Sequence, residues 1–205
     1  MVHRREVEGQ PAIFGNQGDL FLNAMTWFDH ETGSVWSQPT GEAILGPLTG
    51  TQLELLPSSL TTWEAWSERF PDTRALDTMN VRSGFELTNL ALVGVSGDEA
   101  VAVPMRDLIE LGSVSAQIAG EPVLFVAEAS APRPAVYSRL VDGEERSLEL
   151  RSGELVDTDT GQRWDPDTGA SISGGPGLDR IGSLSSRRSD FANHFPDGVL
   201  LNLDR

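Results

Sequence analysis

The chain of 205 residues contains neither cysteine nor lysine, so that every basic residue is an arginine. The absence of cysteine excludes disulfides, thiolate zinc sites and cysteine nucleophiles. No apolar run approaches the length of a membrane span, and the first residues, MVHRREVEGQP, lack the long apolar core of a signal peptide. We therefore expect no membrane insertion. Taken as it stands, the chain would be cytoplasmic, whereas a start truncated ahead of Met1 would allow an extracytoplasmic protein.

Positive charge is also scarce: the chain has 15 arginines and 31 acidic residues, which gives a formal net charge of −16. Binding a phosphate backbone depends largely on cationic side chains that displace condensed counterions, so nucleic acid is excluded as a partner. An anionic membrane surface is disfavoured for the same reason. The excess of carboxylates indicates either adaptation to high salt or only a codon bias that favours arginine, and we keep both interpretations open.

One stretch of the chain occurs twice. Residues 27–48 read WFDHETGSVWSQPTGEAILGPL, and residues 155–176 read LVDTDTGQRWDPDTGASISGGP, a thinner copy in which Thr-Gly turns and a tryptophan recur at an offset of 128. Farther on, a Phe-Pro-Asp triplet begins at Phe70 and again at Phe195, an offset of 125. Self-similarity at this length predicts two related halves, residues 1–80 and 81–205, packed as one globular body around a pseudo-twofold relation.

The spacing of turn residues predicts short antiparallel strands, with tight turns between residues 10 and 45 and a hairpin at Gly97-Asp98. In LTTWEAWSERF the period changes, because an aromatic face recurs at helical spacing and Thr61 followed by Glu64 resembles a capping box. We expect this helix to bury its aromatic face in the core, and residues 77–85 to form a connector. The predicted fold class is α+β and β-rich, with one short aromatic-faced helix in each half.

The turns of the first copy concentrate the candidate chemistry of the chain. Glycoside cleavage needs two carboxylates roughly 5–10 Å apart, and a hairpin could bring Glu31 and Glu42 that close. An acidic residue with Thr-Gly is equally typical of a local turn, and the second copy has Ala170 in place of Glu42. We therefore favour a non-catalytic binding or structural module over its alternative, a carboxylate-based hydrolase of a carbohydrate-like substrate. The predicted ligand-binding residues are Trp27, Asp29, His30, Trp36 and Gln38.

A second pattern concerns calcium, which prefers closely spaced oxygen ligands. The second copy offers four aspartates, but Gly161 stands where a third loop ligand is expected and no bidentate glutamate follows. Two consecutive Thr-Gly turns explain the same spacing, and the three histidines are scattered. We predict no metal site and no cofactor, with an unknown small molecule, glycan or protein as partner. The weak calcium candidates are Asp157, Asp159, Asp165 and Asp167.

Three stretches carry a resemblance to a known family: GNQGDLFLNAMTWFDHETGSVWSQPTGEAILGPLTGTQLELLPS with the TTWEAWSERFPDT that follows, then LALVGVSGDEAVAVPMRDL, then LVDTDTGQRWDPDTG. The chain resembles the family called domain of unknown function 3179, in the form associated with salt-loving archaea. That family has no established activity to carry over. Many of its members hold a Cys-Pro-x-Cys motif where this chain has residues 128–131, EASA, so any thiol or metal chemistry of theirs is lost here. Many members also look exported or lipid-anchored.

If the acidic surface reflects adaptation to salt, molar salt should raise the melting temperature, because an ionic strength of 1 M screens carboxylate repulsion beyond about 3 Å. Thermal unfolding followed by circular dichroism in dilute buffer and in molar potassium chloride measures this. A melting temperature that stays constant or falls would contradict adaptation and leave codon bias as the explanation.

Overall fold

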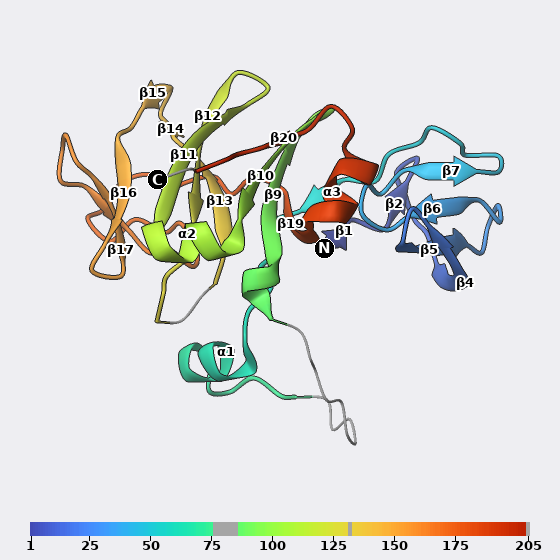
Figure 1. Ribbon diagram of the computed structural model, residues 1–205, viewed down its shortest axis with the longest axis horizontal. Coiled ribbons are helices and arrows are strands. Elements are labelled where there is room, and N and C mark those ends of the chain that lie inside the picture. Colours follow the sequence, from blue (N-terminus) through green and yellow to red (C-terminus); the bar gives the residue numbers. More distant parts are fainter. Residues whose placement is uncertain (76–85, 131–132, 204–205) are drawn as a thin grey trace.

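The computed structural model describes residues 1–75, 86–130 and 133–203. Its strands form a row of sheets along the longest axis of the molecule, with the N-terminal strands at one end and residues 140–176 at the other (Figure 1). A central sheet, in the order β19-β9-β10-β20, separates the two ends. The predicted connector, residues 77–85, lies outside the described residues.

The N-terminal end consists of short antiparallel strands around a four-stranded sheet, in the order β4-β5-β6-β7. The turn between β4 and β5 lies at Leu22 and Asn23, both with positive φ, as a tight hairpin turn requires. The glycine-containing pairs at residues 15–16 and 18–19, which the sequence marks as turn formers, lie inside β4 instead. A register shift between Asn16 and Leu20 accommodates them there. The strands are β1 Val2–His3, β2 Glu6–Val7, β3 Gln10–Pro11, β4 Phe14–Phe21, β5 Ala24–Asp29, β6 Val35–Ser37, β7 Ala43–Leu45 and β8 Leu55–Leu56.

The middle of the chain supplies strands that are buried on both faces. Along β9 and β10, alternate residues face opposite clusters: Leu92 and Val101 pack with the β11–β13 sheet and helix α2, whereas Val93 and Ala102 pack with β19 and helix α3. This alternation explains why these strands read as continuous apolar runs. The elements are β9 Leu90–Ser96, β10 Glu99–Pro104, α2 Met105–Leu111, β11 Ser113–Ile118, β12 Glu121–Val126 and β13 Ala135–Ser138.

The C-terminal part adds another sheet and then returns to the centre. Strand β12 turns its second face, through Leu124 and Val126, toward the β16–β18 sheet, whose Trp164 is fully buried. The chain then completes the central sheet with β19 and with β20, which runs parallel to β10. The elements are β14 Leu140–Val141, β15 Glu144–Glu145, β16 Leu148–Arg151, β17 Glu154–Asp157, β18 Arg163–Trp164, β19 Ser183–Arg187, α3 Arg188–His194 and β20 Val199–Leu200.

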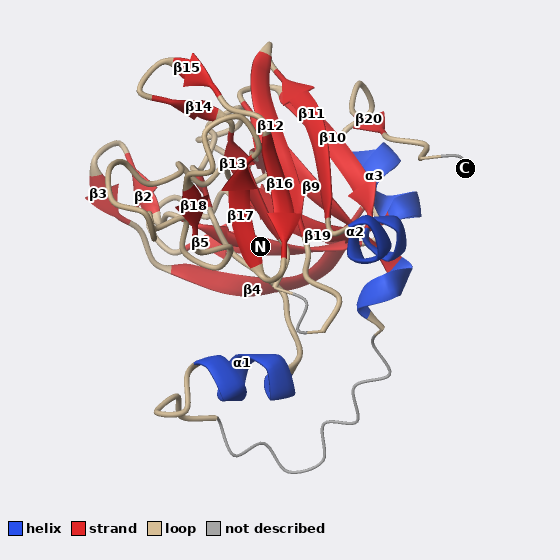
Figure 2. Cartoon of the chain, turned by 90° about the vertical axis from the view of Figure 1, so that its left-hand side faces the viewer, coloured by secondary structure: helices blue, strands red, loops and turns tan. Residues whose placement is uncertain are grey.

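The predicted fold class is confirmed, since the protein is β-rich with several small antiparallel sheets and short helices. Helix α1, Trp63–Arg69, differs from expectation in its environment. It stands apart from the sheets (Figure 2), with Trp63 54% and Trp66 36% exposed and Ala65 as its buried residue. The expectation that its aromatic face enters the core is therefore wrong. The ring of Trp66 packs instead on Phe70, with centroids 4.5 Å apart.

The N-terminal cap of α1 also lies one residue from the predicted position. The side chain of Thr62, not that of Thr61, accepts the hydrogen bond from the Ala65 amide. At the other end, the backbone of Phe70 turns away at φ −129° and ψ 73°, and that of Phe195 after α3 does so at φ −130° and ψ 71°. The two helices thus end alike, although Phe191 of α3 is buried in the core.

The two copies also share strand register. Trp36 pairs with Trp27 on one side and Ala43 on the other, and Trp164 pairs with Leu155 and Ser171 in the corresponding way. Both turns before these tryptophans close with a glycine amide that donates to the carbonyl four residues earlier, Gly33 to Asp29 and Gly161 to Asp157. The 1–80 and 81–205 division of the chain stays a prediction.

Two glycines in related turns permit a matched test of packing. Gly161 and Gly169 have φ of +74° and +72°, so alanine at either position is strained. A Cβ at Gly161 meets nothing within 4 Å, whereas one at Gly169 would lie 2.6 Å from the Leu178 carbonyl oxygen and 2.8 Å from the Tyr137 ring.

We expect Gly161→Ala to lower the free energy of unfolding by about 1 kcal/mol, the cost of the left-handed backbone. Gly169→Ala should cost about 1–3 kcal/mol more, because the added methyl group overpacks the turn. Urea unfolding of both variants measures the difference. Equal losses would show that the close approach to Leu178 and Tyr137 does not constrain the turn.

Candidate functional site

Asp29 and Trp36, two of the predicted binding residues, form a buried pair at the end of β5. The Asp29 carboxylate accepts hydrogen bonds from the Thr32 amide at 2.6 Å, the Thr32 hydroxyl at 2.9 Å and the Trp36 indole Nε1 at 2.9 Å. Both residues are at most 1% exposed. Burial raises the pKa of the Asp29 carboxyl, but the hydrogen bonds from Trp36 and Thr32 outweigh it and hold this pKa below its usual value. The pair therefore stabilises the turn and presents no surface to solvent.

The corresponding turn of the second copy keeps the aspartate but changes the partner of the tryptophan. Asp157 accepts a hydrogen bond from the Thr160 hydroxyl at 2.6 Å and from the Asp159 amide at 3.2 Å. The indole of Trp164 donates to the Pro176 carbonyl oxygen at 2.9 Å instead of to a carboxylate. The turn chemistry is shared between the copies, and the bond between carboxylate and indole belongs to the first.

The two candidate catalytic carboxylates lie at opposite ends of β6. Glu31 belongs to the turn between β5 and β6, while Glu42 follows the turn between β6 and β7, where its carbonyl accepts the Ser37 amide. The strand between these turns has three residues, which span roughly 10 Å at about 3.3 Å each. Both side chains are exposed, and Glu31 lines a hollow of about 220 Å³ beside the β2–β3 hairpin, which Glu42 does not line. The hairpin does not bring the two carboxylates into one cleft.

The four aspartates considered for calcium divide between two turns and have other partners. Asp165 and Asp167 both accept hydrogen bonds from Arg69, and Asp167 also pairs with Arg133 at 2.5 Å. Burial raises the pKa of Asp165, but hydrogen bonds from Thr168 and the Asp167 amide outweigh it and lower the pKa. Asp159 is exposed and Asp157 is occupied by its own turn. Within residues 1–75, 86–130 and 133–203, no group of three or more acidic or histidine side chains could hold a metal ion.

Trp27, by contrast, lines an open space. It borders a hollow of about 300 Å³ whose other walls come from β1, β4 and the segment before β8, and which we call the Trp27 hollow. Its ring is partly buried and lies edge-on to His3, with centroids 5.8 Å apart, and to Phe14, with centroids 6.3 Å apart. The lining residues are His3, Arg5, Ile13, Phe14, Trp27 and Leu53.

His3 links this hollow to Gln38, another predicted binding residue. Its Nε2 lies 2.9 Å from the Gln38 carbonyl oxygen, and its Nδ1 is buried without a hydrogen-bond partner in the described part of the chain. Burial lowers the pKa of the His3 imidazole, so the neutral ring is favoured. His30 lies outside the hollow: it is exposed and contacts the Phe28 ring, with centroids 4.9 Å apart.

In the sequence, His3 is one of three scattered histidines, and the predicted site does not include it. In the structure, β1 pairs His3 with Leu55 of β8, and this pairing places the imidazole against the Trp27 ring. A strand of two residues gives no periodicity from which that pairing could be read.

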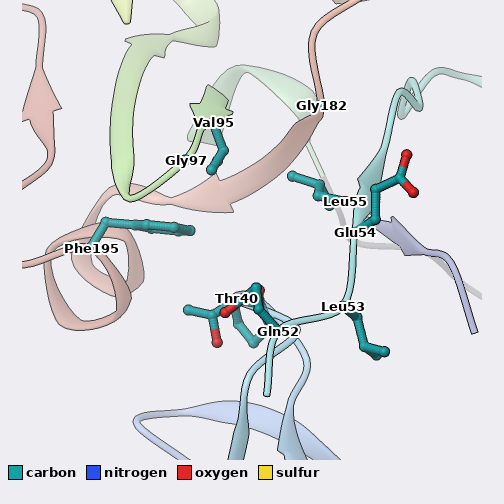
Figure 3. A pocket seen from close by; sticks show the side chains of 10 residues that line it. Thr40, Gln52, Leu53, Glu54, Leu55, Val95, Gly97, Gly182 and Phe195 are labelled. Carbon is teal, nitrogen blue, oxygen red and sulfur yellow. The ribbon is translucent and has the colours of Figure 1, made fainter. Parts of the chain in front are cut away.

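A further cavity, of about 270 Å³, lies at the seam between the N-terminal strands and the central sheet (Figure 3). Thr40, Gln52 and Leu55 line one side, and Val95 and Phe195 line the other. Its charged residue, Glu54, pairs with Arg4 at 2.5 Å, and the Gln52 side chain donates to the Thr40 carbonyl oxygen. These polar groups already have protein partners, so the cavity is a packing seam.

Helices in the described residues are short, and none of them has the length and apolar character to cross a membrane.

Because the folded pKa of Asp29 is depressed, its stabilising effect is present above the unfolded value of about 3.9 and is lost as pH falls through the folded value. We expect Asp29→Asn to lower the free energy of unfolding by about 2–3 kcal/mol at pH 7, since hydrogen bonds to a charged acceptor are replaced by weaker ones. The difference from wild type should shrink below about pH 4.

Urea unfolding between neutral pH and pH 3 measures this, with Glu31→Gln as the control because that carboxylate is exposed in the same turn. A loss in Asp29→Asn that stays constant with pH would show that the charge of Asp29 does not matter for the turn.

Comparison with known proteins gives a family match for the N-terminal part of the chain and no function. Residues 1–85 match the model of a family described as "Protein of unknown function (DUF3179)". No curated protein and no solved structure matches the chain. The match covers the N-terminal sheet, the Trp27 hollow and α1, and the resemblance of the later residues stays a prediction. This match over residues 1–85 supports the resemblance to the DUF3179 family that the opening residues predict.

Proposed function

We propose that this protein is a non-catalytic binding module whose ligand occupies the Trp27 hollow. The single observation that carries the proposal is a partly buried tryptophan that borders an open space of about 300 Å³ together with a second aromatic ring and an imidazole. Small-molecule sites are concave and mostly apolar with a few placed polar groups, and this hollow has that character.

The lining favours a ligand with one flat apolar face and a polar edge, such as a pyranose ring. Trp27, Phe14 and Leu53 supply the apolar walls. Arg5 supplies a cationic donor at the rim, where it is exposed, and its Nη1 contacts the Ala12 carbonyl oxygen at 3.3 Å. His3 is held by the Gln38 carbonyl and stays neutral at physiological pH, so it adds polarity without charge.

The alternative function, a carboxylate-based hydrolase, has no specific observation in its favour. Two catalytic carboxylates must flank one bond, whereas Glu31 lines the hollow beside the β2–β3 hairpin and Glu42 does not line it. Asp29, the remaining carboxylate of these turns, is enclosed by Thr32 and Trp36. We therefore assign these acidic residues to turns and surface.

We further propose that residues 1–80 and 81–205 are related units, of which the second has lost the binding hollow. Shared strand register and matching helix ends support this relation. At the position of Trp27 the second unit has Leu155, which is fully buried in its own core. An aliphatic side chain in that place packs and offers no ring to a ligand.

We expect at least one member of a panel of mono- and disaccharides to raise the melting temperature of the wild-type protein, as a ligand that binds only the folded state must. Trp27→Leu, which keeps apolar volume but removes the ring, should abolish the shift, whereas Trp66→Leu should retain it because Trp66 lies on α1, outside the hollow.

Absence of any shift across the panel, or an equal shift in Trp27→Leu, would overturn the proposed site. Product release from a panel member that is lost in Glu42→Gln would favour the hydrolase instead.

A further inference from the structure

Another cavity, of about 330 Å³, lies between helix α1 and loops of the later part of the chain, and it shares no lining residue with the Trp27 hollow. We call it the α1 cavity and define it by Ser59, Trp66, Phe70, Arg133, Asp167 and Arg180, which line it. Its lining combines two chemistries: aromatic rings from α1 and its C-terminal cap, and guanidinium groups from the later part of the chain.

Ion pairs and hydrogen bonds hold the helix over the cavity. Arg69 of α1 reaches Asp165 and Asp167, and Arg133 donates to Asp167 at 2.5 Å and to the Ala65 carbonyl oxygen at 3.4 Å. Both oxygens of the Asp167 carboxylate are therefore occupied by arginine nitrogens. The single negative charge in the cavity wall is neutralised within the protein.

Arg180 is the cationic group without such a partner. Its Nη2 donates to the Ser59 hydroxyl at 2.9 Å, its Cζ lies 5.9 Å from the centroid of the Tyr137 ring, and no carboxylate of the described residues forms an ion pair with it. Its Nε is buried and has no hydrogen-bond partner there. A guanidinium at the wall of a cavity that lacks a counter-ion is unexpected in a chain with about twice as many carboxylates as arginines.

The aromatic part of the lining favours a ligand with a planar apolar ring. Trp66 and Phe70 stand 4.5 Å apart at 40°, and the Trp66 indole nitrogen already donates to the Thr73 hydroxyl at 3.1 Å, which fixes the ring. Trp66 nonetheless remains 36% exposed. A flat ring that entered the cavity would cover this exposed indole while a carboxylate on the same molecule accepted hydrogen bonds from Arg180.

We propose that the α1 cavity binds a small aromatic or otherwise planar carboxylate, with Arg180 as the anion-binding residue and Trp66 as the apolar wall. Such a site is independent of the Trp27 hollow, because it uses other residues, another charge and another class of ligand. It also accounts for the exposed Trp66 on a helix that contributes little to the core.

Isothermal titration calorimetry with 2-naphthoate and with the uncharged 2-naphthamide tests the proposal on the full chain. We expect 2-naphthoate to bind and 2-naphthamide to bind at least about tenfold more weakly, since hydrogen bonds to a charged group are lost. Arg180→Gln should weaken 2-naphthoate by a similar factor. Arg106→Gln is the matched control, because it removes the same charge from an exposed arginine on α2, outside the cavity.

A second pair of variants keeps the test decisive if Arg180→Gln does not fold, which circular dichroism would reveal. Trp66→Leu should weaken 2-naphthoate severalfold, whereas Trp63→Leu, on the same helix but outside the cavity, should not change it. Equal affinities for the two probes, no measurable binding at millimolar 2-naphthoate, or equal losses within either pair of variants would overturn the proposal. Trp27→Leu should leave 2-naphthoate binding intact, which separates this site from the Trp27 hollow.

Discussion

The fold depends on one constraint, that its middle strands must be covered on both faces. Strand β9 buries Leu92 toward one neighbouring sheet and Val93 toward the other side, and β12 divides Val123 and Leu124 in the same way. Three hydrophobic clusters are thereby joined through shared strands, while the N-terminal sheet encloses a smaller cluster around Trp36. These small sheets are stable only when packed against one another, because each middle sheet relies on its neighbours to cover its apolar faces.

The acidic turns are structural for a reason that follows from their geometry. In a five-residue Thr-Gly turn, the aspartate at the first position faces the amides and the hydroxyl that follow it. Its carboxylate therefore accepts hydrogen bonds within the turn, as at Asp29, Asp157 and Asp165. The aspartate spacing that suggested calcium binding thus follows from the hydrogen bonds that define the turns. What remains for ligands lies on strand faces and between elements, at Trp27 and beside α1.

Much of the fold follows from local signals that the sequence displays. The Gly97-Asp98 hairpin and the family match of residues 1–85 are found where the residues predict them. The turn at Leu22-Asn23 could not be predicted, because the glycines nearby are stronger turn formers and a bulge absorbs them. The burial of the α1 aromatic face could not be predicted either. Periodicity shows that a helix has an aromatic face, but it does not show whether another apolar surface packs against that face.

Helices α1 and α3 end with the same backbone geometry but pack in different environments. In α3 the aromatic residue four positions before the terminal phenylalanine, Phe191, enters the central core, since β9, β10 and β19 present an apolar face to it. In α1 the equivalent Trp66 lines a cavity together with Arg133, Asp167 and Arg180, and charged groups are costly to bury against an indole. The helix is therefore held by ion pairs at its edges, and an open, partly cationic space persists beneath its rings. The same sequence pattern closes a core at α3 and leaves an open cavity at α1.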